Sequence, residues 1–297
     1  MRAYERFMEY ALFPTMSDEK SGSCPSTKKQ QKLAKYLKDE LISLGLSDAR
    51  VDDNGYVYAT LPKNFDGEAP AIGFISHLDT SPDASDENIN LNVVDYSGGD
   101  ILLNEEKQIY MKVSDYPYLS DYEGHHLIVS DGTTLIGADD KAGIAEIMTA
   151  LQKIIDSGIK HGKISVAFTP DEEIGRGADL FDVEGFGADY AYTVDGGAIG
   201  EIEYENFNAA SARVHINGVS IHPGSAKGKM KNAALIASEF NSLLPEDEIP
   251  SKTEGYEGFH HLTGMVGEIE SATLSYIIRD HDMQKFESRF CATITYI

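Results

Sequence analysis

The sequence is poor in cysteine, in basic residues and in long apolar runs. Of its 297 residues only Cys24 and Cys291 are cysteines, which argues against a disulfide framework and predicts a reducing, cytoplasmic location. Lysine and arginine number 25 against 49 acidic residues, a net charge of −24, which argues against nucleic acid or an anionic membrane as partner. No apolar run reaches transmembrane length, and the first residues lack the apolar core of a signal peptide.

The remaining composition is that of a globular protein with one large domain or two ordinary ones. Hydrophobic residues make up 41% and charged residues 25% of the chain. Helical and strand patterns alternate up to Asp195, which predicts a mainly parallel α/β sheet. After Gly200 the order strand, helix, strand, strand predicts a small α+β module. A last helix is expected from about Asp282, followed by a β-prone tail at 291–297.

The chain is organised around residues 134–146, where Asp139 and Asp140 stand between a short apolar stretch and an amphipathic helix. Acidic residues at a helix start commonly cap free N–H groups and interact well with the helix dipole. The alternative is that one of the two carboxylates binds metal. Other candidate ligands elsewhere in the chain decide between these interpretations.

Three further predicted strands run into metal-binding residue types. They are followed by His77 and Asp79, by Asp171, Glu172 and Glu173, and by Asp195. In open α/β sheets, sites lie at the carboxyl ends of the strands. One histidine with several carboxylates is a ligand set that suits zinc. A solvated helix start is the alternative for the three consecutive acids.

The pattern predicts a pair of metal ions. Two divalent ions can convert a shared water to hydroxide near neutral pH and polarise a carbonyl group. We expect Asp139 to bridge the two ions, with His77 and Asp195 completing one site and Glu173 binding the other ion.

Two carboxylates have expected roles beside the ions. Glu172 adjoins a ligand, and we expect it to act as the general base toward the water. Asp79 lies two residues after His77, on the same side of an extended strand. We expect it to orient the imidazole by a hydrogen bond, without binding the metal itself.

These motifs resemble the peptidase T family, the tripeptide aminopeptidases among the co-catalytic zinc exopeptidases. The resemblance covers nearly the whole chain from Glu5 to about Arg289. It is carried by the motifs at 77–83, 137–151, 167–175, 192–197, 205–210, 222–228, 253–259 and 276–280.

The resemblance implies removal of the N-terminal residue from small peptides with two Zn²⁺ ions per complete site. It implies a catalytic domain at 1–207, interrupted by a lid or dimerisation-type α+β domain that begins at 208 and runs to 297, with a homodimer through the lid as a candidate assembly. It assigns His77, Asp139, Glu173 and Asp195 as ligands and Asp79 and Glu172 as catalytic. His222 and Arg279 match lid residues that help to bind substrate, with packing or surface charge as the alternative.

The resemblance stops after Arg289. Family members continue through the lid and return to the catalytic domain, where a histidine completes the second metal site. His281, the last histidine of this sequence, stands at the start of a lid helix and cannot be assigned as that ligand. The expectation is that both domains are incomplete at the C-terminus, and that this chain binds one ion better than two and has little activity.

Two alternatives to the tripeptide aminopeptidase remain open from the sequence. One is a dipeptidase or deacylase with the same di-zinc architecture. The other is a metal-binding remnant without turnover. Metal stoichiometry and a tripeptide assay separate them.

Overall fold

The computed structural model describes residues 1–295. The chain divides into two compact units, Met1–Glu201 and Ile202–Ile297. A domain boundary between residues 207 and 208 stays a prediction. Within the described residues, no helix is both long enough and apolar enough to cross a membrane.

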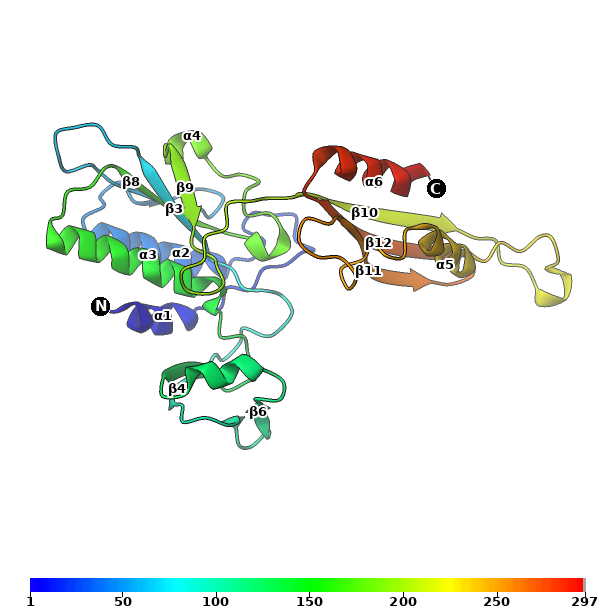
Figure 1. The fold of residues 1–297 in the computed structure, drawn as a ribbon, viewed down its shortest axis with the longest axis horizontal. Coiled ribbons are helices and arrows are strands. Elements are labelled where there is room, and N and C mark those ends of the chain that lie inside the picture. The colour runs from blue at the N-terminus through cyan, green and yellow to red at the C-terminus, as the bar shows by residue number, and fades with distance from the viewer. Residues whose placement is uncertain (296–297) are drawn as a thin grey trace. The chain divides into compact units, whose positions relative to one another are not determined.

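The first unit is built on a sheet of five strands. They are β1 (Arg50–Val51), β2 (Val57–Leu61), β3 (Ile72–His77), β8 (Ile164–Thr169) and β9 (Tyr190–Thr193) (Figure 1). Their order is β1-β2-β8-β3-β9. Strands β8, β3 and β9 are parallel, whereas β1 and β2 join antiparallel, so the expected α/β class is confirmed and the sheet is mixed. The β1–β2 turn contains Gly55 with a φ of 88°, as the Asn54-Gly55 hairpin signal predicts.

Both faces of this sheet are covered. On one face lie helices α1 (Ala3–Ala11), α2 (Gln30–Ser43) and α3 (Ala138–Ser157). Apolar residues at helical spacing on α2, such as Leu33 and Leu37, are fully buried in this core with Val57 and Val166 of the sheet. On the other face, Tyr56, Tyr58, Ala167 and Phe186 form a second cluster beside the short helix α4 (Val183–Phe186). The covered faces leave the ends of the strands as the place for a site.

The polar stretch after β3 forms short paired strands. Strand β4 (Leu91–Asp95) pairs with β7 (His126–Ser130), and β5 (Ile101–Asn104) pairs with β6 (Ile109–Met111). The 3-10 helix η1 (Pro117–Tyr122) completes this part, which has a small core of Tyr96, Ile101 and Leu119.

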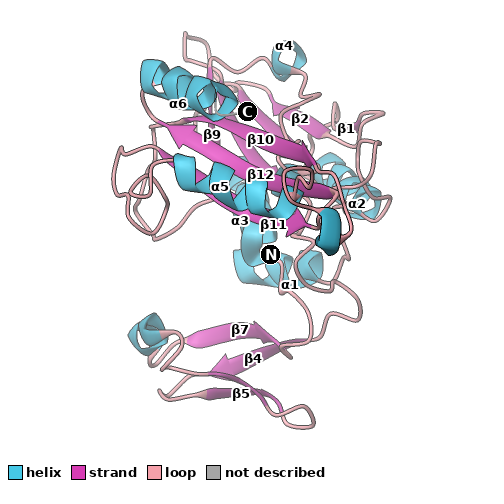
Figure 2. Ribbon diagram, turned by 90° about the vertical axis from the view of Figure 1, so that its right-hand side faces the viewer, coloured by secondary structure: helices cyan, strands magenta, loops and turns pink. Residues whose placement is uncertain are grey.

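The second unit has the predicted strand-helix-strand-strand order. Its strands β10 (Asn208–Asn217), β11 (Phe259–Gly267) and β12 (Ser271–Asp280) form an antiparallel sheet with β12 in the centre. Helix α5 (Ala233–Leu243) lies across this sheet (Figure 2). Its Ala237 and Phe240 pack on Leu274 and Tyr276, which alternate along β12 with more exposed residues. This period of two is that of a strand buried on one face.

Helix α6 (Met283–Thr295) follows β12 directly. The β-prone character predicted for the tail is therefore wrong as far as Thr295, and residues 296 and 297 lie outside the described part. The reason is that adding residues to an existing helix costs far less than starting one, so β-branched residues can extend it.

Candidate metal centre

The candidate centre lies at the carboxyl ends of the parallel strands in the first unit. His77 is the last residue of β3 and pairs in register with Thr169, the last residue of β8. Glu172 and Glu173 follow β8 in the 3-10 turn η2 (Glu172–Ile174), and Asp195 follows β9 by two residues. Because parallel strands end at one edge of the sheet, these side chains are brought together there.

Asp139 and Asp140 stand at the start of α3 but have different environments. Both have non-helical backbone angles, and the peptide bond between them is cis. Asp139 Oδ1 lies 2.8 Å from His77 Nε2. The buried Asp140 carboxylate instead accepts the backbone N–H of His77 at 3.0 Å, and burial raises its pKa to about 8. As predicted, Asp139 rather than Asp140 faces the imidazole ring.

Two more carboxylates lie near the same ring nitrogen. Glu172 Oε2 lies 3.8 Å and Asp195 Oδ2 3.9 Å from His77 Nε2. Two groups of possible ligand atoms result, each contained within 4.8 Å: His77 with Asp139 and Glu173, and His77 with Glu172 and Asp195. This grouping differs from the expected one, because Glu172, the predicted base, falls in a possible ligand group with His77 and Asp195. The individual roles of these residues stay predictions.

Asp79 is fully buried and contacts both the histidine and the glutamate pair. Its Oδ1 lies 3.4 Å from His77 Nδ1, slightly beyond an ordinary hydrogen bond. Its two oxygens accept the backbone N–H groups of Glu172 at 2.9 Å and Glu173 at 3.2 Å. The carboxylate expected to orient the imidazole thus also fixes the backbone that carries both glutamates.

The electrostatics of the cluster favour a cation. Burial, reinforced by neighbouring acids, raises the pKa of Glu172, Glu173 and Asp195. Burial alone would lower the pKa of His77, but the carboxylates of Asp139 and Asp79 outweigh it and raise that pKa to about 11. Several acids therefore share one imidazole, and a bound divalent ion would be the largest local charge and would offset their mutual repulsion.

The donor set fits a metal ion. In a tetrahedral zinc site with bonds of about 2.0–2.2 Å, ligand atoms lie roughly 3.4 Å from one another. The 4.8 Å limit within each group therefore leaves only small side-chain movements to close on an ion. Nitrogen and carboxylate oxygen are both suitable zinc ligands.

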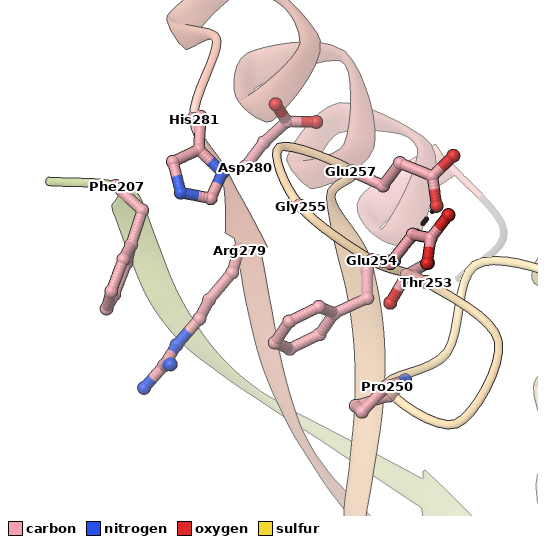
Figure 3. A pocket seen from close by; sticks show the side chains of 10 residues that line it. Phe207, Pro250, Thr253, Glu254, Gly255, Glu257, Arg279, Asp280 and His281 are labelled. Carbon is pink, nitrogen blue, oxygen red and sulfur yellow. Dashed lines mark hydrogen bonds between the residues drawn. The ribbon is translucent and has the colours of Figure 1, made fainter. Parts of the chain in front are cut away.

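His222 and Arg279 lie in the second unit, whereas the metal centre is built from the first. His222 is exposed, and its Nδ1 accepts the N–H of Gly224 at 3.1 Å. The Arg279 guanidinium lies 4.3 Å from the centre of the Phe207 ring. It lines a pocket of about 330 Å³ between β12 and the 250–259 segment (Figure 3). His281 lies in the same pocket with its ring edge-on to Tyr256.

Asp171 is a buried neighbour of the site whose contacts the sequence pattern does not reveal. It belongs to the same acidic run as Glu172 and Glu173, yet its side chain is fully buried and its φ is 59°. The available signal was its place directly after a fully buried strand, but its partners Ser26 and Gln30 are over 140 residues away in sequence.

Comparison with known proteins agrees with this arrangement. Residues 204–293 match the peptidase dimerisation domain. Peptidase T of Clostridium botulinum is 56% identical over 287 residues, which are 96% of this chain and 70% of that protein. The crystal structure of the aminopeptidase PepT from Bacillus cereus superposes with a TM-score of 0.72 at 25% identity, covering 99% of this chain and 70% of that one. A tripeptidase from Staphylococcus aureus shares the fold with a TM-score of 0.71 at 21% identity, with the same coverage of both chains.

The identity and its extent decide the family. A match at 56% identity includes both units and every predicted ligand position from His77 to Asp195 within its span of 96% of the chain. The site geometry supplies an independent argument, since a histidine and several carboxylates meet at one sheet edge. The chain belongs to the peptidase T family of metal-dependent peptidases.

Proposed function

We propose that the chain is a tripeptide aminopeptidase with Zn²⁺ as its metal. The observation that carries this proposal is the convergence of Asp139, Glu172 and Asp195 oxygens within 3.9 Å of one imidazole nitrogen. Family membership supports the reaction, because the relatives described above are a peptidase T, an aminopeptidase and a tripeptidase.

The residues at the centre would divide between holding metal and moving a proton. His77, Asp139, Glu173 and Asp195 would hold the ions. When bound, two divalent ions lower the pKa of a water molecule toward neutrality and polarise the peptide carbonyl. A carboxylate oxygen of Glu172 would accept the proton from the water and pass it to the leaving amine.

Substrate recognition is proposed from charge. The acidic centre and the net charge of −24 favour the positively charged amino terminus of a small peptide. Arg279 could pair with a substrate carboxylate, because its buried Nε has no hydrogen-bond partner among the described residues. His222 is proposed as a second substrate contact on the strength of the family resemblance.

The second unit is proposed to join two copies of the chain. It carries the match to the peptidase dimerisation domain at residues 204–293. We infer a homodimer through this unit, which we propose as the lid domain that begins near residue 208. A cytoplasmic location stays a prediction from the composition.

Metal stoichiometry and peptide hydrolysis test the proposal. The 297-residue chain is purified, freed of metal, reloaded with Zn²⁺ and assayed on Ala-Ala-Ala, on Ala-Ala and on N-acetyl-Ala-Ala-Ala. We expect two ions per chain and turnover of the free tripeptide at about 1–1000 per second. Chelation should abolish this activity.

The control substrates separate the alternatives. Preferred cleavage of the dipeptide would indicate a dipeptidase, and removal of the acetyl group a deacylase. Metal binding without hydrolysis of any of the three would contradict the proposal. One ion per chain with little turnover is the outcome expected from the sequence, and it would contradict the activity proposed here for this chain.

A further inference from the structure

The buried carboxylate of Asp171, directly before the glutamate pair, is hydrogen-bonded to a distant segment of the chain. Asp171 Oδ2 accepts the backbone N–H of Ser26 at 2.7 Å. Its Oδ1 accepts the Ser26 hydroxyl at 2.5 Å and the Gln30 side-chain amide at 2.6 Å. The Asp171 N–H in turn donates to Gln30 Oε1 at 3.2 Å. The 26–30 segment and Asp171, more than 140 residues apart in sequence, thus form one closed network.

This network is fully enclosed. Ser26, Gln30 and Asp171 are 8%, 1% and 0% exposed. A buried network in which every member finds its partners is rigid, whereas a buried group that loses a partner is costly. The positions of Asp171 and its partners are therefore strongly coupled.

Asp171 also has a backbone conformation that residues with a side chain rarely adopt. Its φ of 59° lies in the left-handed region, which asparagine and aspartate tolerate better than other residues with a side chain. The chain turns at this point from β8 into η2, which carries Glu172 and Glu173. The hydrogen bonds to Ser26 and Gln30 hold the turn in this conformation.

The glutamate pair is consequently fixed from two sides. Asp79 accepts the N–H groups of Glu172 and Glu173, next to the imidazole. Asp171, the residue just before them, is anchored to Ser26 and to Gln30, the first residue of α2. A further bond fixes the far end of the turn, since the Arg176 guanidinium donates to the carbonyl of Ser21 at 2.7 Å.

We propose that Asp171, held by Ser26 and Gln30, is a positioning residue for the glutamate pair. It touches none of the reacting atoms and acts by fixing the backbone from which Glu172 reaches the water and Glu173 reaches the metal. This inference rests on the proposed function for its effect on catalysis, but its effect on metal binding is independent of turnover.

Gln30→Ala is the first test, with Gln31→Ala as the matched control. Gln31 is the exposed neighbour on the same helix. Loss of a hydrogen-bond partner of a metal ligand typically lowers metal affinity or activity by about 10–100-fold. Gln30 acts one step further away, through Asp171, so its loss should have an effect at the lower end of this range. We expect Gln30→Ala to lower kcat and the affinity of the more weakly bound Zn²⁺ by about tenfold or more, with KM changed less than about twofold. Gln31→Ala should match the wild type in all three.

Asp171→Asn tests the carboxylate itself. Asparagine keeps the size of the side chain and tolerates the left-handed conformation. Its amide N–H₂ group, however, would face a hydrogen-bond donor at a place where an Asp171 oxygen now accepts a hydrogen bond. We expect losses in kcat and Zn²⁺ affinity at least as large as those of Gln30→Ala. Asp179→Asn, an exposed position on the same loop, is the control and should leave both unchanged.

Thermal unfolding and chelator competition separate positioning from stability. Variants that lower the melting temperature, yet keep wild-type kcat and Zn²⁺ affinity when folded at 25 °C, would overturn the inference. If Asp171→Asn fails to fold, Gln30→Ala decides by the same criteria. If the wild type binds Zn²⁺ but cleaves no tripeptide, the proposed function fails, and the change in Zn²⁺ affinity still decides the role of Asp171.

Discussion

Both units contain acidic side chains with a shifted pKa, but the shifts have opposite directions. At the metal centre, burial and neighbouring acids raise the pKa of Glu172, Glu173 and Asp195. In the second unit, burial acts against the charge of Asp280, but hydrogen bonds from Arg289 and from the Asp282 N–H outweigh it and lower the pKa. The Arg289 Nε lies 2.8 Å from Asp280 Oδ2, and the same guanidinium pairs with Glu248.

The difference separates an acid that stabilises the fold from acids that are arranged to bind a ligand. Asp280 has its own cation and adds to the stability of the second unit. The acids at the metal centre share the imidazole of His77 and repel one another, an arrangement typical of functional sites. Removing a carboxylate should therefore cost stability in the second unit and activity in the first.

Glu172→Gln should give the largest effect. The change keeps the size of the side chain but removes the proposed base, so kcat should fall by at least about a hundredfold while Zn²⁺ stays bound. Kinetics on a tripeptide with metal analysis of the same sample measure both quantities. Glu239→Gln, at an exposed position on α5, should change neither.

Glu173→Gln completes this comparison. It removes a proposed ligand and should lower Zn²⁺ affinity. Because Glu172 also lies in a possible ligand group with His77 and Asp195, reversed roles are a defined outcome. Loss of Zn²⁺ in Glu172→Gln, with normal metal content in Glu173→Gln, would contradict the assignment.

Asp280→Asn should give the next largest effect, on stability. It removes a buried acceptor of a charged hydrogen bond, so the free energy of unfolding of the second unit should fall by about 1.5–3 kcal/mol. Urea unfolding and hydrogen exchange of the β12 amides measure this change. Asp247, whose side chain is 84% exposed and pairs with Lys252, is the control. Asp247→Asn should change stability by less than about 1 kcal/mol, and an equal effect at both positions would contradict the comparison.

Local sequence patterns were sufficient to predict the strands and the residues at their ends. The apolar stretch before His77 and the one before Asp171 each form a strand of the central sheet. Parallel pairing then brings His77 and Glu172 to one edge without further information. The strand, helix, strand, strand order predicted after Gly200 is likewise found, as β10, α5, β11 and β12.

The sequence could not predict contacts that depend on side-chain direction or on distant partners. Whether Glu172 or Glu173 joins Asp195 depends on where each side chain points after the turn. The bond between Gln30 and Asp171 spans 141 residues, and no local pattern marks it. The antiparallel pairing of β2 with β8 is also non-local, which is why the mixed character of the sheet was not expected.

The smallest predicted effect is the acid dependence of the second unit. A carboxylate whose folded pKa is lowered stabilises the fold fully above its unfolded pKa, about 3.9 for aspartate, and loses this contribution as the pH falls through the folded value. Because Asp280 has a lowered pKa, its contribution should be constant from pH 7 down to about 4 and decline below that. Protonation removes the same charge that Asp280→Asn removes permanently. The difference in unfolding free energy between wild type and Asp280→Asn, measured by urea unfolding at each pH, should therefore stay level above about pH 4 and shrink below it. Other carboxylates cancel in this difference, so a change between pH 5 and 7 would mean that Asp280 is not held charged by Arg289.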